Sequence, residues 1–220
     1  MKSVLALFLK DVSSEMRTRY ALNALVMFVV TSIAITLFAI AAETSSSLVL
    51  AGVLWILIFF SSMSGLSRTF VSEEERGTTL LLQLLAIPSV IFRGKLLFNI
   101  LLMMFLNLIT VLLYLLLVED FIVKNFGIFS LTIFLGTLCL ATSSTILAAI
   151  VAKANTKGTL YPVLSFPILL PLLVSVISLT KLAVEGAEWT KTIQDFQVLI
   201  SYLAIALTAS LLLFDFIWKE

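Results

Sequence analysis

The charged side chains that could do chemistry gather in one stretch, RTFVSEEERGTTLLLQLLAIPSVIFRGK, at positions 68–95. Three glutamates stand in a row there, Glu73, Glu74 and Glu75, and Arg76 follows them directly. Paired carboxylates can serve as general acids and bases, and they can equally pair with basic residues of a partner protein. Nearly everything on either side is apolar, so the surroundings of these charges decide their role.

The residue types needed for catalysis do not accompany these charges. The chain has no histidine, which removes the Ser/His/Asp and Cys/His arrangements of nucleophilic enzymes. Gly94 and Lys95 lack the upstream glycine spacing and the following Ser or Thr of a phosphate-binding loop. A second acidic pair, Glu119–Asp120, borders an apolar run, where solvation explains it. We therefore expect that this chain is not an enzyme and that any ATP is bound and hydrolysed by a separate subunit.

The absence of histidine also bears on cofactors. Proteins that hold heme stably usually supply His as an axial ligand, and sometimes Met, Cys or Tyr. Met63, Met103 and Met104 lie in apolar runs, where packing explains them. No cluster with the spacing of metal ligands appears in the sequence. We expect that this chain itself binds neither a cofactor nor a metal.

The composition indicates a membrane protein. Of 220 residues, 61% are hydrophobic and 12% are charged, and the mean hydropathy is +1.17. A soluble domain typically has about 25% charged residues. The net charge of +1 argues against a nucleic-acid partner, which requires a basic face. The single cysteine, Cys139, excludes a disulfide framework within the chain.

Six uncharged runs are long enough to cross a bilayer as helices, which takes about 20 residues. They cover residues 20–42, 44–67, 96–118, 125–152, 158–180 and 196–214. Of the Lys and Arg residues, 11 fall in the segments on the side of the termini and 3 fall in the opposite loops. Because basic residues mark the cytoplasmic side, we expect both termini and the 68–95 loop in the cytoplasm. The fold class is thus an all-α integral membrane protein, with residues 1–220 as one domain.

The segments outside the spans carry helix signals of their own. Residues 1–19 place Val4, Phe8 and Val12 on one face, which predicts an amphipathic helix in the membrane interface; a frayed leader into the first span is the alternative. In the 68–95 loop, Ser72 and Glu75 fit a capping box, which would put the glutamates in a first helical turn. Thr78 or Thr79 can cap a second helix, rich in leucines such as Leu81 and Leu84, that Pro88 ends. These leucines predict either a docking surface or a loop that lies against the membrane.

Special residues inside the spans suggest packing or motion. Pro162, Pro167 and Pro171 imply a bent or broken fifth span, which acts either as a hinge or pathway element or as a static kink. Close approach of another helix is predicted along the fourth span, where small residues recur at Ser144, Ala148 and Ala152. Asn107 lies near the middle of the third span, where an interhelical hydrogen bond or a substrate contact would satisfy its amide.

The stretch from Gly65 to Asn99 resembles the segment that follows the second span in ABC-2-type permeases. An acidic patch, Gly-Thr, a leucine-rich helix, Pro and Gly-Lys stand here in the same order. The runs FFSSMSGLSRTF, EEERGT and SFPILLPLL further resemble the CcmB family, the permease-like subunits of the heme exporter in cytochrome c maturation, over essentially the whole chain. The resemblance implies that residues 68–95 form the loop that couples to an ATPase. The residues at this ATPase-coupling site would be Glu73, Glu74, Glu75, Arg76, Gly77, Thr78, Leu81, Leu84 and Pro88.

The resemblance also implies the setting. The chain would be the transmembrane subunit of a transporter in the bacterial inner membrane, and a CcmA-like ATPase would drive export of heme or release of a heme-loaded chaperone. Expected partners are a second copy of the chain, CcmC-like and CcmD-like subunits and membrane lipid, with heme handled by the complex. Two alternatives stay open: a permease of the same superfamily for a lipid, glycan or drug, and a membrane scaffold that transports nothing.

Overall fold

The computed structural model describes residues 2–18, 20–40, 46–75, 77–153 and 157–219, and these residues are overwhelmingly helical. The helices along the chain are α1 (Lys2–Thr18), α2 (Tyr20–Ile40), α3 (Ser47–Leu66), α4 (Arg68–Glu75), α5 (Thr79–Leu85), α6 (Pro88–Leu117), α7 (Phe126–Ala152), α8 (Lys157–Glu185) and α9 (Ile193–Lys219). A short 3-10 turn, η1 (Trp189–Lys191), precedes α9.

Six of the described helices are long and apolar enough to cross a membrane. Their spanning segments are Leu22–Ala39, Ser47–Val71, Pro88–Leu117, Phe126–Ala152, Val163–Glu185 and Ile193–Trp218. Helices are the expected form because lipid cannot satisfy free backbone groups. The prediction of an all-α, six-span membrane protein is therefore confirmed.

The start of the third spanning helix differs from the prediction: α6 begins at Pro88, so residues 88–95 belong to this helix. Proline suits a first helical turn, because the amide it lacks would have no partner there.

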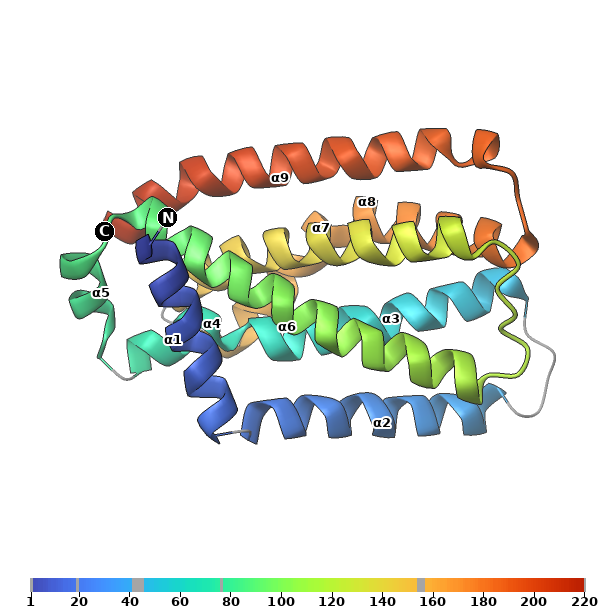
Figure 1. Cartoon of the computed structure of the whole chain (residues 1–220), viewed down its shortest axis with the longest axis horizontal. Helices are drawn as coiled ribbons and strands as arrows, with labels where there is room; N and C mark the ends of the chain where they lie inside the picture. Colours follow the sequence, from blue (N-terminus) through green and yellow to red (C-terminus); the bar gives the residue numbers. More distant parts are fainter. Residues whose placement is uncertain (1, 19, 41–45, 76, 154–156, 220) are drawn as a thin grey trace.

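The long helices lie side by side, with α2 and α9 on opposite edges in the view of Figure 1. Of the six spanning segments, that of α7 is the most deeply buried. Both ends of the chain lie at one end of the bundle, together with α1, α4 and α5 (Figure 1). The segments that join α6 to α7 and α8 to α9 lie at the other end.

Polar side chains pin the spanning helices together. Trp55 of α3 is fully buried and donates its indole N–H to Thr180 of α8 at 2.8 Å. A Cβ on Gly136 of α7 would lie 2.4 Å from the Trp55 ring, so this glycine makes room for the indole. The Asn107 amide donates to Thr137 of α7 at 2.8 Å. The interhelical hydrogen bond, one of the two predictions for Asn107, is thus observed.

The fifth span is not broken. α8 continues from Lys157 to Glu185 through all three proline positions. Pro167 and Pro171 are exposed, so they face away from the bundle. The side chain of Pro162 lies outside what the structure describes. Between the two exposed prolines, the carbonyl of Ile168 accepts a hydrogen bond from Tyr202 of α9 at 3.1 Å. A hinge or pathway role for these prolines stays a prediction.

Candidate partner-docking site

The α4–α5 unit, residues 68–85, is built as two short helices at the end of the bundle that carries the termini (Figure 1). α4 follows α3 after a single residue, Ser67, and ends at Glu75. Glu73, Glu74 and Glu75 therefore occupy the last turn of a helix, not the first turn that we predicted. Carboxylates are unfavourable at a helix C-terminus because the carbonyl ends of the dipoles point there. The capping-box interpretation was wrong because tertiary charge pairs outweigh this local rule.

The turn between α4 and α5 depends on Gly77 and Thr78. Gly77 has a φ of +66°, a conformation that suits glycine. Its amide donates to the Glu74 carbonyl at 3.1 Å, and the Thr78 amide donates to the Glu73 carbonyl at 3.0 Å. Thr78 precedes α5 as predicted, but its hydroxyl bonds to the Glu73 carboxylate and does not cap α5.

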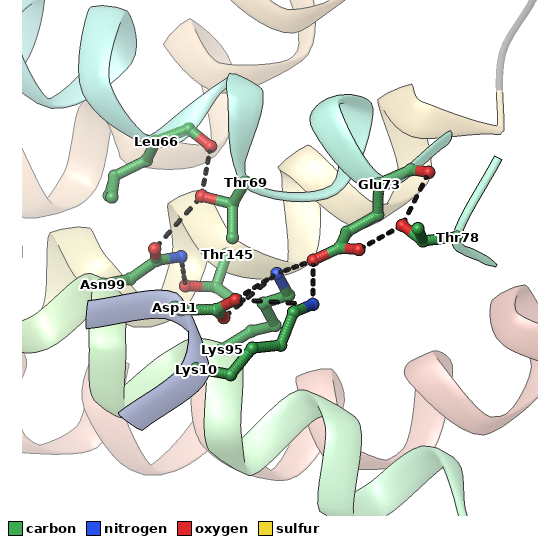
Figure 2. A network of polar contacts seen from close by, with 9 residues as sticks. All are labelled: Lys10, Asp11, Leu66, Thr69, Glu73, Thr78, Lys95, Asn99 and Thr145. Carbon is green, nitrogen blue, oxygen red and sulfur yellow. Dashed lines mark hydrogen bonds and ion pairs between the residues drawn. The ribbon is translucent and has the colours of Figure 1, made fainter. Parts of the chain in front are cut away.

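Glu73 lies at the centre of a charge cluster formed by Lys10, Asp11, Glu73 and Lys95 (Figure 2). One oxygen of Glu73 accepts from Lys10 of α1 at 2.7 Å and from Lys95 of α6 at 2.8 Å. Lys95 also lies 3.0 Å from a carboxylate oxygen of Asp11. Asp11, Glu73 and Lys95 are buried, whereas the Lys10 side chain is about half exposed.

The formal charges of the cluster sum to zero, which suits a site with little water. Burial alone would raise the pKa of Glu73. The positive charge of Lys95 and hydrogen bonds from Lys10, Lys95 and Thr78 outweigh that effect and lower the pKa to about 2. Glu73 is therefore ionised at neutral pH. Its side chain faces the interior, so it does not lie on the surface of the α4–α5 unit.

A second set of polar contacts joins the same unit to α6 and α7 (Figure 2). The Thr69 hydroxyl of α4 lies within hydrogen-bonding distance of two acceptors, the Leu66 carbonyl at 2.9 Å and Oδ1 of Asn99 at 3.0 Å, and it can donate to either. The Asn99 amide donates to Thr145 of α7 at 2.8 Å. Thr69 thus links α4 to α6 and, through Asn99, to α7.

An aromatic cluster, Phe70, Phe92, Phe214 and Trp218, holds the unit against α6 and α9. Phe70 of α4 packs on Phe214 and Trp218, with ring centroids 5.5 Å and 5.7 Å apart. Phe214 and Trp218 stack at 5.2 Å. Gln83 of α5 donates to the Trp218 carbonyl at 2.7 Å. The unit therefore contacts α1, α6, α7 and α9 through side chains of different chemistry.

The outer side of the unit is apolar with a carboxylate beside it. Leu84 is 86% exposed and Leu85 73%, and Leu81 and Ile87 are exposed too. Glu74 is exposed and accepts a hydrogen bond from Thr79 at 2.7 Å. Of the other predicted site residues, Arg76 lies outside the described residues, and so does the side chain of Glu75. Pro88 is the first residue of α6.

The small-residue row of α7 is enclosed within this chain. Ser144, Ala148 and Ala152 are buried, and α7 packs on α8 and α9. The Ser144 carbonyl accepts a hydrogen bond from Tyr161 of α8 at 3.5 Å. The close approach predicted for this row is therefore made by helices of the same chain.

Comparison with known proteins decides the family. The sequence model described as CcmB protein matches residues 2–219, which is essentially the whole chain. The chain belongs to the CcmB family. No curated protein matches it. As a CcmB protein it is a multi-pass membrane permease subunit of the heme-exporting ABC transporter in cytochrome c maturation, and the permease itself is not catalytic.

Sequence reasoning missed the inner half of this CcmB site. The prediction of an amphipathic helix over residues 1–19 did not single out Lys10 or Asp11 for this site. Lys95 was noted for an incomplete phosphate-binding motif and within the Gly-Lys pair of the family resemblance, and neither observation predicts a buried ion pair. A signal for Lys95 exists: a lysine followed by a long apolar run belongs to a helix that enters the membrane, where a cation needs an acidic partner. The nearby glutamate run offers three such partners, although the sequence does not show which one turns inward.

Proposed function

We propose that the outer face of the α4–α5 unit docks an ABC ATPase, and that this contact couples ATP hydrolysis in the partner to movement of the CcmB spans. The observation that carries the proposal is the exposure of Leu81, Leu84 and Leu85 on a short helix that lies beyond the spanning segments. A large exposed apolar patch typically marks an interaction site. Glu74 beside it would meet a basic residue at the rim of the contact.

The two kinds of residue have different tasks. Burial of a leucine contributes about 1.5–3 kcal/mol, so the leucines supply affinity. A rim charge mainly sets register and association rate. Because the Glu73 side chain points inward, we confine the proposed docking surface to Glu74, Gly77 and the exposed residues of α5, with Glu75 and Arg76 as candidates from the sequence.

The cellular setting completes the proposal. Lys and Arg predominate in the segments that share the end of the bundle with the termini, which favours that end for the cytoplasm. The ATPase is CcmA-like and the membrane is the bacterial inner membrane. Two copies of the permease form the transport unit with CcmC-like and CcmD-like subunits. The chain has no histidine, so heme ligation falls to the other subunits.

The test is co-purification of the ATPase from membranes in which both subunits are expressed. Leu84→Asp should lower the recovered ATPase by about tenfold or more, as expected when the burial of one leucine is lost. Glu74→Lys should slow association and make recovery more dependent on salt. Matched controls lie at the opposite end: Ile122→Asp, which also replaces an exposed apolar residue, and Glu119→Lys.

Normal recovery of the ATPase with Leu84→Asp and with Glu74→Lys would refute docking at this face. Reduced recovery with unchanged ATP turnover in the complexes that remain would favour the scaffold alternative. The amount of permease in the membrane serves as the control for folding in every variant.

A further inference from the structure

The N-terminal helix α1 contacts the α4–α5 unit at the buried Glu73, not at the exposed leucines. Its Lys10 reaches Glu73 directly at 2.7 Å. Its Asp11 reaches Lys95, which in turn lies 2.8 Å from the same Glu73 oxygen. Neither contact takes part in docking a partner, because Asp11, Glu73 and Lys95 are buried. A second role is needed to explain why α1 is joined to the α4–α5 unit by ion pairs that include buried charges.

Gly94, next to Lys95 on α6, lies where α1 and α6 approach each other closely. A Cβ at this position would lie 2.9 Å from the Cβ of Leu7 and 3.5 Å from the Val4 carbonyl oxygen. The Leu7 Cβ is fixed to the backbone of α1, so a side chain on Gly94 can be accommodated only by shifting the helix. The two residues of the Gly-Lys pair therefore have separate structural roles. Gly94 lets α1 approach α6 closely, and Lys95 joins α6 to Glu73 of α4.

A simple membrane anchor would not need this arrangement. Leu5, Leu9 and Met16 form an exposed apolar stripe along α1, and such a stripe suffices to hold a helix in the membrane interface. Burying Asp11 against Lys95 costs desolvation free energy, and this cost does not improve the attachment of a helix to the membrane. Buried polar contacts of this kind can instead fix one register between packed elements.

We propose that α1 is a moving part of the coupling mechanism, and that Glu73 is the positioning residue through which the α4–α5 unit moves it. The proposal rests on the function proposed above. When the ATPase displaces α4, the Glu73 carboxylate carries Lys10, and with it α1, while Lys95 transmits the same displacement to α6. The interfacial helix and the third span then move together.

Lys10 is the link best suited to a test. Its side chain is half exposed, so Lys10→Gln breaks the direct α1–α4 ion pair and leaves the buried Glu73–Lys95–Asp11 contacts in place. Lys10→Arg keeps the cation. Arg17→Gln is the matched control, because it removes an exposed cation from the same helix. Gly94→Ala changes no charge and displaces α1 by bulk alone.

The experiment uses the permease assembled with its ATPase in nanodiscs and measures two quantities: the amount of bound ATPase and the stimulation of ATP turnover by the permease. Lys10→Gln should leave the bound ATPase unchanged and lower the stimulation by about two- to fivefold, the effect expected for one half-exposed ion pair. Gly94→Ala should give the same separation of binding from stimulation. Lys10→Arg and Arg17→Gln should behave like the wild type.

A direct reading of movement distinguishes coupling from a merely structural role. With Cys139→Ala as background, Ser13→Cys on the exposed side of α1 takes an environment-sensitive fluorophore. Its emission should change between the nucleotide-free and the vanadate-trapped complex, and Lys10→Gln should reduce that change without abolishing it, because the Asp11–Lys95–Glu73 contacts still join α1 to α4.

Three results would overturn the proposal. The first is wild-type stimulation in both Lys10→Gln and Gly94→Ala. The second is a loss of bound ATPase in Lys10→Gln as large as in Leu84→Asp, which would place α1 in the docking surface itself. The third is an α1 fluorophore that does not respond to nucleotide in the wild type. Failure of the docking proposal is distinguishable from all three, because then Leu84→Asp retains the ATPase.

Discussion

Removing the charge of Glu73 should destabilise the folded permease by about 3 kcal/mol. The pKa of this carboxyl falls from 4.5 to about 2, and each pKa unit corresponds to about 1.4 kcal/mol of preference for the ionised form. Breaking a buried ion pair by removing one partner costs about 3–5 kcal/mol in other proteins. The estimate from the pKa and the estimate from other buried ion pairs agree because both describe the same loss of free energy. Without the Glu73 charge, the buried Lys95, which is only 4% exposed, loses one of its two acidic partners.

A double-mutant cycle tests this reasoning. Glu73→Gln leaves the charge cluster with one excess positive charge, and Lys95→Met leaves it with one excess negative charge. The double variant is neutral again, with Lys10 and Asp11 already 3.8 Å apart. We expect the double variant to be no less stable than the worse single variant, so that the two effects are far from additive. The assay is unfolding of the purified protein by SDS titration in mixed micelles, followed by circular dichroism.

The dependence on pH provides an independent check with a fixed sign. A carboxyl whose pKa is lowered by folding contributes stability that is complete above its unfolded pKa and is lost as the pH falls through its folded pKa. For Glu73 this window runs from pH 4.5 down to about 2. The stability difference between wild type and Glu73→Gln should be constant from neutral pH to pH 5 and should shrink below 4.5. A difference under about 0.5 kcal/mol at pH 7, the range of ordinary surface substitutions, would refute the argument, as would additive single effects.

Two further predictions concern packing. Gly136→Ala should cost about 1–3 kcal/mol through overpacking against Trp55, and it should cost less in a Trp55→Phe background, as measured by thermal unfolding; equal costs in both backgrounds would contradict the contact. Trp218→Ala should increase hydrogen exchange at the amides of α5. The substitution removes the indole that packs on Phe70 of α4 and on Phe214, and so loosens the α4–α5 unit. Phe216→Ala, exposed on the same helix, is the control, and unchanged exchange in Trp218→Ala would contradict the prediction.

The spanning helices could be predicted from sequence because the membrane imposes a length and a backbone pattern on each segment separately. The second short helix of the 68–95 stretch, α5, was also predictable from its leucines, whereas the first helix was predicted to start at Ser72 and α4 starts at Arg68. The position of the glutamates within α4 was not predictable, because local capping rules favoured the first turn. What decides their position is a pair of lysines 63 and 22 residues away in the sequence, and no local pattern reports contacts at that separation.

The candidate site divides in the same way. The exposed leucines follow from composition, because an apolar helix outside a span must meet either lipid or protein. The inner contacts of Glu73, Thr69 and Phe70 depend on which faces of α1, α6, α7 and α9 meet, and this is a property of the assembled bundle. The prediction of a broken fifth span was wrong because a proline removes one amide donor and does not by itself end a helix in a membrane bundle: α8 continues from Lys157 to Glu185.

The three inner contacts of α4 differ in how they respond to force, and this bears on how the unit could transmit movement. Close-packed rings such as Phe70 and Trp218 resist compression but slide with little directional preference. The bond between Thr69 and Asn99 has a preferred direction, which fixes α4 against α6 and α7. The ion pairs of Glu73 act over longer distances than either and weaken more gradually with separation. A unit held in all three ways can tilt about its aromatic side while its charged side stays attached to α1 and α6. Displacement at the outer leucines would then reach the spans through Glu73 before it disturbs the packed core.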